Sequence, residues 1–275
     1  MSHAWEQIPR SDGDVVASST DSVEQSDQAE TLFGKPDGTI VISDGKTTES
    51  IRVSRHPVGS LLLSPKGNYI VAAVFPEGEE KYRILWDRGA GKVVEQFPGS
   101  PLYHSRQAIS PDEFVLAYSA DDYSIVLWNI PQRRETSVLN GHTWHLYGLE
   151  FAPVSRLLAS FDWDGFCRLW DVGEGKPADP HILRGHLSGI SYAAFSADGR
   201  TIATRADDDS ARFWSVATGQ ELLSQRSEPL SHPLISPQGD RLVGLTAEGG
   251  ERNIRVVTLP SLSEIDAMIS RENRQ

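Results

Sequence analysis

The sequence has few or none of the residues that several classes of protein require. Cys167 is its single cysteine, so a framework of disulfide bonds and a cysteine-based zinc site are both excluded. No apolar run approaches the ~20 residues of a membrane-spanning helix. Residues 1–10 also lack the basic and apolar segments of a signal peptide. Lysine and arginine (26) are outnumbered by acids (38), which gives a net charge of −12. We therefore expect a cytoplasmic protein that contacts neither membranes nor nucleic acid.

The motifs of the common enzyme classes are missing as well. The 275 residues contain no G-x-S-x-G, H-E-x-x-H, G-x-x-x-x-G-K-[ST] or G-x-G-x-x-G pattern. His142 and His145 are three residues apart, but they lie in a predicted loop and no third ligand is near them in the sequence. We predict no catalytic residue, no metal site and no cofactor.

Residues 1–30 differ in composition from the rest of the chain. They contain seven acids and one base, and their only apolar cluster is Val15–Ala17. Such a segment buries too little apolar surface to offset the entropy lost on ordering. We expect residues 1–30 to be mostly disordered, unless Val15–Ala17 supplies an edge strand, and residues 31–270 to form the folded domain.

Four tryptophans reveal an internal repeat. They are spaced by 42, 42 and 44 residues, and each follows a short apolar or mixed segment: Trp86, Trp128, Trp170 and Trp214. Ser43 and Val257 lie one further period of 43 residues before and after this series, in similar segments without tryptophan. A period of this length is typical of repeat proteins, and the sequence therefore predicts six copies.

Turn sequences recur in the same phase. Ser64-Pro65, Ser110-Pro111, Ser196-Ala197 and Ser236-Pro237 each stand between two short apolar runs. The pattern thus predicts four strands in each copy. The first two are apolar and joined by a turn, the third ends in tryptophan, and the fourth is polar. A four-stranded sheet of this size cannot bury its faces alone, whereas copies packed around an axis can.

These residues resemble the WD40 repeats of β-propeller proteins. The resemblance is strongest at Gly141-His142 to Asp171 and at Gly185-His186 to Trp214. It implies an all-β, WD40-like propeller of about six four-stranded blades, with seven blades or incomplete closure left open. It also implies a structural hydrogen-bonded chain of histidine, hydroxyl, carboxylate and indole in each of these two copies. The expected members are His142, Ser160, Asp164 and Trp170, and then His186, Thr204, Asp208 and Trp214.

Two further tryptophans are not explained by the repeat. Trp144 follows the Gly-His loop, and Trp163 precedes Asp164 in a turn, so both are expected at one rim of the propeller. Asp121 and Asp207 occupy the register of Trp163 in the adjacent copies. Because tryptophan is enriched among interface hot spots, we expect Trp144, Trp163, Asp121 and Asp207 to bind a partner, with packing between blades as the alternative for the tryptophans.

The expected function is a non-catalytic scaffold that binds a protein or peptide, and the acids favour a basic or amphipathic one. The alternative is a sensory or regulatory WD40 module of a larger bacterial signalling enzyme, such as a kinase or protease. A hydrolase on a propeller scaffold is the least favoured hypothesis, since the sequence offers no cluster of catalytic acids or histidines. The sequence leaves the oligomeric state open.

Overall fold

A computed structural model describes residues 15–18, 30–98, 106–173, 179–226, 231–235, 241–248 and 251–258. Every regular element within these ranges is a β-strand, and the strands form six antiparallel sheets. The chain divides into two compact units, Met1–Pro101 and Leu102–Gln275. Five sheets have four strands and the sixth has three described strands. The predicted all-β class and the repeated four-stranded sheet are confirmed.

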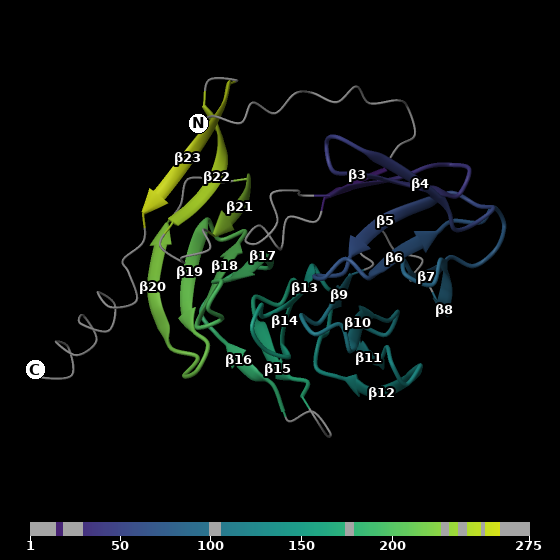
Figure 1. Cartoon of the computed structure of the whole chain (residues 1–275). Coiled ribbons are helices and arrows are strands. Elements are labelled where there is room, and N and C mark those ends of the chain that lie inside the picture. The colour runs from purple at the N-terminus through teal and green to yellow at the C-terminus, as the bar shows by residue number, and fades with distance from the viewer. Residues whose placement is uncertain are drawn as a thin grey trace, which may run out of the picture. The chain divides into compact units, whose positions relative to one another are not determined.

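The first unit contains two sheets whose strands follow one another in chain order (Figure 1). The first sheet comprises β1 (Val15–Ser18), β2 (Thr31–Gly34), β3 (Thr39–Ser43) and β4 (Thr48–Arg52). The second comprises β5 (Val58–Leu63), β6 (Tyr69–Val74), β7 (Tyr82–Asp87) and β8 (Lys92–Pro98). β1 is the segment that the sequence singled out as a strand donor, and it pairs with β2. The rest of the leader predicted to be disordered, residues 1–14 and 19–29, lies outside the described residues.

Alternating burial builds the core of the first unit. In β3, Ile40 and Ile42 are buried and their neighbours are partly exposed, as the two-residue period of a strand requires. These residues join a cluster with β5 and β6 in which Ile70 and Val74 have no exposed surface. Gly34 permits the close approach of β2 and β5, because a Cβ atom there would lie 2.3 Å from the Val58 carbonyl oxygen.

The second unit contains four sheets. Three have four strands: β9 (Gln107–Ile109), β10 (Val115–Ser119), β11 (Ile125–Asn129) and β12 (Arg134–Leu139); β13 (Gly148–Phe151), β14 (Leu157–Phe161), β15 (Cys167–Asp171) and β16 (His181–Leu183); β17 (Ile190–Phe195), β18 (Thr201–Ala206), β19 (Ser210–Ser215) and β20 (Glu221–Arg226). The fourth sheet comprises β21 (Ser231–Ile235), β22 (Arg241–Glu248) and β23 (Glu251–Thr258). The remainder of the predicted domain, residues 259–270, lies outside the described residues.

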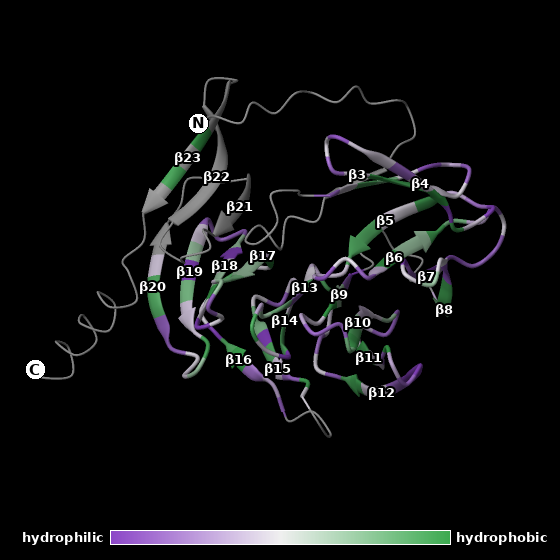
Figure 2. Ribbon diagram, in the orientation of Figure 1, coloured by the Kyte–Doolittle hydropathy of each residue, from purple (hydrophilic) through white to green (hydrophobic). Residues whose placement is uncertain are grey.

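The first strands of these sheets are neighbours. β13 contacts both β9 and β17, and β17 contacts β21 (Figure 1). Each sheet therefore presents its first strand to the first strands of the adjacent sheets, which is the arrangement of successive propeller blades. Apolar residues gather in the strands and hydrophilic residues in the turns between them (Figure 2).

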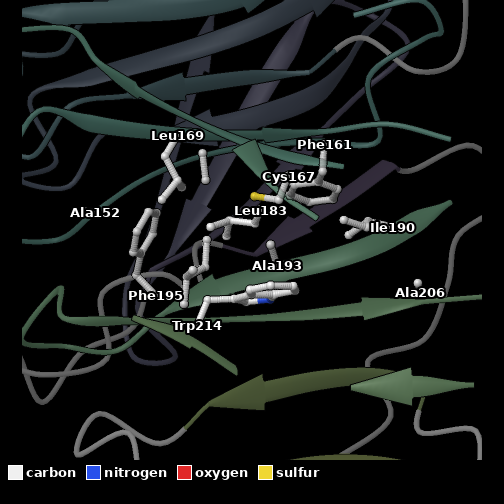
Figure 3. Close-up of a cluster of buried hydrophobic side chains, with 12 residues drawn as sticks. Ala152, Phe161, Cys167, Leu169, Leu183, Ile190, Ala193, Phe195, Ala206 and Trp214 are labelled. Carbon is white, nitrogen blue, oxygen red and sulfur yellow. The ribbon is translucent and has the colours of Figure 1, made fainter. Parts of the chain in front are cut away.

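Apolar side chains fill the spaces between adjacent sheets. Phe161, Cys167 and Leu183 of one sheet pack with Ile190 and Trp214 of the next (Figure 3). A second cluster joins the preceding pair of sheets and includes Trp170. The sheets are thus held by face-to-face burial, the dominant favourable contribution to folding.

The four repeat tryptophans occupy one register. Each lies opposite the second residue of its sheet's second strand, in the pairs Ile70–Trp86, Leu116–Trp128, Leu158–Trp170 and Ile202–Trp214. The equivalence that the spacing predicted is therefore confirmed strand by strand.

Candidate functional site

The sheet of β17–β20 contains a hydrogen-bonded chain of four side chains. The indole Nε1 of Trp214 donates to Thr204 Oγ1 at 2.8 Å, and His186 Nε2 lies 2.7 Å from the same oxygen. The other ring nitrogen of His186 lies 3.2 Å from Asp208 Oδ2. These are the four residues that the resemblance indicated, and the chain links the loop before β17 to β18 and β19.

The sheet of β13–β16 contains the corresponding chain with one difference. Trp170 Nε1 donates to Ser160 Oγ at 2.7 Å, and His142 Nε2 lies 2.7 Å from that oxygen. The carboxylate beside His142 Nδ1 is Asp162, at 2.7 Å. The prediction of Asp164 as the acidic member is therefore wrong.

Neighbouring side chains explain this difference. Asp162 directly follows β14 and is fully buried, so it is the first carboxylate that the turn brings to His142. Ala206, two residues after Thr204, holds the position that Asp162 holds after Ser160, which leaves the later residue Asp208 to pair with His186. Asp164 instead accepts a hydrogen bond from Arg168 at 2.5 Å.

The two carboxylates are strongly stabilised in their charged form. Burial raises the pKa of Asp162, but hydrogen bonds from His142 and the Asp164 backbone outweigh it and bring the pKa to about 2. Burial likewise raises the pKa of Asp208, yet donors from Ser210 and the Leu187 backbone bring that pKa to about 2. Burial lowers the pKa of His186, against the opposing effect of Asp208. Both chains have the properties of structural networks whose members satisfy one another.

Two sheets without the complete hydrogen-bonded chain have a different residue at the position of Ser160 and Thr204. Ala72 stands opposite Ile84 in β6–β7, where the complete sheets have Ser160 or Thr204. The indole Nε1 of Trp86 is consequently buried without a hydrogen-bond partner. Tyr118 holds the same position in β10, as the sequence indicated.

Strand order brings five segments to one end of the second unit. In an antiparallel sheet with neighbours in chain order, the turn between strands two and three lies at the same end as the connection to the next sheet. This end, called the loop end below, collects residues 120–124, 140–147, 162–166, 184–189 and 207–209. All four predicted partner-binding residues lie on these segments.

An aromatic pair forms the centre of the loop end. The rings of Tyr147 and Trp163 lie 5.6 Å apart at an interplanar angle of 36°. The indole of Trp163 also packs on Gly189 of the next sheet, where an added Cβ atom would lie 2.7 Å from Trp163 Cε3. Trp163 is nevertheless 48% exposed, and Leu187, two residues before Gly189, is 89% exposed. Packing between sheets therefore orients the indole without covering it.

Trp144 lies on the same end beside a second aromatic contact. It is 56% exposed, and the adjacent His145 packs edge-on against Tyr123 with ring centroids 4.7 Å apart. Asp121 is exposed two residues before Tyr123. Asp207 is exposed as well, and its backbone N–H donates to the Gly189 carbonyl at 3.0 Å. Asp207 thus bonds to the glycine on which Trp163 packs, whereas Asp121 and Trp144 lie within two residues of the Tyr123–His145 contact.

Tyr147 and Leu187 were missed in the sequence. Tyr147 directly precedes β13 and is not one of the residues that recur in each repeat. Its contact with Trp163 depends on how β13 and the turn after β14 approach each other. Leu187 directly follows the network residue His186, and this position relative to the Gly-His pair is a signal that could have identified it.

Other kinds of site find little support in the described ranges. These residues contain no group of three or more histidine, cysteine, aspartate or glutamate side chains placed to hold a metal ion. Cys167 is fully buried, and burial raises the pKa of its thiol. No helix in the described part of the chain has the length and apolar character of a membrane span.

Comparison with known proteins agrees with this geometry. The family model "WD domain, G-beta repeat" matches residues 133–171 and 179–215. Periodic tryptophan protein 2 of Arabidopsis thaliana is 32% identical over 136 residues, which is 49% of this chain and 15% of that protein. Human Coronin-7 is 33% identical over 195 residues, or 68% of this chain and 19% of that protein. The matched region therefore spans less than a fifth of the length of these relatives.

A solved structure with a similar fold is the C-terminal WD40 domain of Sif2. It aligns with 86% of this chain and 65% of its own length, with a TM-score of 0.67 and 20% sequence identity. At this identity the likeness concerns the fold alone.

Proposed function

We propose, since the chain carries WD40 repeats and has the fold of a WD40 domain, that it is a non-catalytic scaffold for protein interaction. Its partner is a peptide or protein segment that binds the loop end through Trp144, Trp163, Asp121 and Asp207. The cytoplasm is the compartment in which we place this function.

The exposure of Trp163 is the observation that carries this proposal. An indole held by Tyr147 and Gly189 loses little side-chain freedom when a partner covers it, so its apolar area contributes to affinity at low entropic cost. Trp144 and Leu187 extend the exposed apolar surface on the same end. Exposed apolar side chains that gather at one end, unlike those scattered singly over a surface, are typical of an interaction site.

The charges at this end determine which peptide fits. Asp121 and Asp207 are exposed carboxylates at corresponding turns on either side of the turn that carries Trp163. Charges at the rim of an interface mainly affect association rate and choice of partner. We therefore expect an amphipathic peptide, with an apolar side chain on Trp163 and basic side chains near the two aspartates.

Selection from a random peptide library displayed on phage tests this proposal. The wild-type chain should enrich peptides that the Trp144→Ala, Trp163→Ala double variant binds at least ~10-fold more weakly, the loss typical of hot-spot residues. Phe114→Ala is the matched control, because Phe114 is 47% exposed and lies in the turn between β9 and β10, at the opposite end of its sheet. Unchanged affinity in a folded double variant, or no enriched peptide at all, overturns the proposal.

A further inference from the structure

Arg106 is a half-buried cation without a counter-charge in the described part of the chain. Its Nε atom is buried and has no hydrogen-bond partner, and no ion pair among the described residues includes its guanidinium. Arg205 in β18 also has a buried Nε without a partner. Five other buried or half-buried arginines each donate to an oxygen. They are Arg83 to Pro98, Arg88 to Glu30, Arg156 to Asp112, Arg168 to Asp164 and Arg212 to Glu221.

No carboxylate among the described residues pairs with Arg106. Residues 99–105, which precede it, include no aspartate or glutamate. Among the described residues, the titratable group that acts on the guanidinium is the phenol of Tyr147 and not a carboxyl group. Burial lowers the pKa of Arg106, as expected for a cation removed from water without compensation. A desolvated charge of this kind is costly unless an anion joins it.

Arg106 lies at the loop end of its sheet. Arg106 directly precedes β9, and its backbone pairs with Ser119 at the last residue of β10. It therefore lies at the end of the sheet where residues 120–124 begin. The phenol of Tyr147 acts electrostatically on the guanidinium of Arg106, and its ring packs against Trp163. Arg106 therefore lies on the loop end, as Tyr147 and Trp163 do.

We propose that Arg106 forms an anion subsite for the partner peptide, which places an acidic side chain on the guanidinium when an apolar neighbour covers Trp163. This inference rests on the proposed function. The anion is a carboxylate or a phosphorylated side chain, both of which accept paired hydrogen bonds from a planar guanidinium. The partner therefore carries an acid toward Arg106 and bases toward Asp121 and Asp207, so that its charges are arranged rather than uniformly basic.

A Glu-to-Gln exchange in an enriched peptide, combined with Arg106→Gln in the protein, tests the subsite. In wild type, the Gln peptide should bind ~10–100-fold more weakly than the Glu peptide, as expected for loss of a partly desolvated charge pair. In Arg106→Gln the two peptides should bind within ~2-fold of each other, because the coupling is lost. Arg106→Lys keeps the charge and should restore part of the preference. Arg134→Gln, which removes an exposed arginine at the start of β12, should leave it unchanged.

Each other outcome has a defined meaning. If Arg106→Gln weakens the Glu and Gln peptides equally, Arg106 only supports the fold and the subsite is overturned. If wild type enriches peptides that need Trp163 but show no preference for an acid, the subsite is overturned and the proposed function stands. If no peptide is enriched, both are overturned. A phosphoserine peptide compared with its Glu and Ser counterparts then distinguishes the two anions.

Discussion

Trp170 Nε1 lies 2.7 Å from Ser160 Oγ in the interior of its sheet. Through Ser160 the indole is connected to His142 and to the buried carboxylate of Asp162. The same indole also packs between two sheets. Trp170 thus contributes both to the apolar packing and to the hydrogen bonding of buried polar groups. Its place in the structure leads directly to the first prediction.

Trp170→Ala should lower the free energy of unfolding by about 3–5 kcal/mol, because it leaves a cavity and breaks the hydrogen-bonded chain. Trp144→Ala is the control, since that indole is 56% exposed and its loss should cost under ~0.5 kcal/mol. Urea unfolding followed by circular dichroism measures both. A loss below ~1 kcal/mol for Trp170→Ala would show that the indole is not the buried anchor described above.

Ala72→Ser should stabilise the first unit. The buried Nε1 of Trp86 has no acceptor, and a serine oxygen at this position repeats the arrangement of Ser160. The expected gain is about 0.5–1.5 kcal/mol, the net value of one hydrogen bond. Ala72→Val adds volume without an acceptor and should destabilise by about 1–3 kcal/mol. Thermal unfolding decides between them, and a serine variant no more stable than wild type contradicts this reasoning.

Stability should fall in acid because of Asp162 and Asp208. Their pKa values are about 2 in the folded chain and near 3.8 when unfolded, so the unfolded chain binds more protons between these values. Their contribution is complete above about pH 4 and is lost as the pH falls toward 2. The lowered pKa of His186 adds a loss that begins as the pH falls through its unfolded value of about 6.5.

Asp208→Asn isolates this effect. The variant should be less stable than wild type at pH 7, and the difference should shrink as the pH approaches 2, because the wild-type carboxylate is then protonated. Urea unfolding at several pH values measures it. A difference that stays constant across this range would contradict the role given to Asp208.

Cys167 should be unreactive in the folded chain. It has no exposed surface, and burial raises the pKa of its thiol, so the reactive thiolate is both scarce and inaccessible. Titration with a thiol-reactive disulfide should give under ~0.1 equivalent in buffer and about one equivalent in denaturant. Rapid reaction of the folded chain would place Cys167 at the surface, against the packing in Figure 3.

The sequence predicts the sheets well because their determinants are local. Tryptophan at a fixed strand position, a turn after each apolar run and alternating burial all repeat with one period, so Trp86, Trp128, Trp170 and Trp214 could be aligned before any contact was known. The resemblance to WD40 repeats, aligned on this period, implied that Thr204, His186 and Asp208 belong to one chain. These features depend on backbone register, which spacing encodes.

The sequence does not predict which turn side chain reaches a partner. Asp162 and Asp164 are two residues apart, and the choice between them depends on Arg168, which binds Asp164 from β15. The sequence likewise does not predict that Tyr147 acts on Arg106, because the two residues precede the first strands of different sheets. Side-chain contacts made by the turns are therefore the part of the site that the structure had to supply.

The indole N–H resonances offer the most direct test of binding at the loop end. Adding a peptide enriched by the wild-type chain to 15N-labelled protein should shift the Nε1–H signals of Trp144 and Trp163, which are about half exposed. The signals of the buried Trp128, Trp170 and Trp214 should stay in place. Shifts at the buried indoles with none at Trp144 and Trp163 would contradict the assignment of this end as the partner surface.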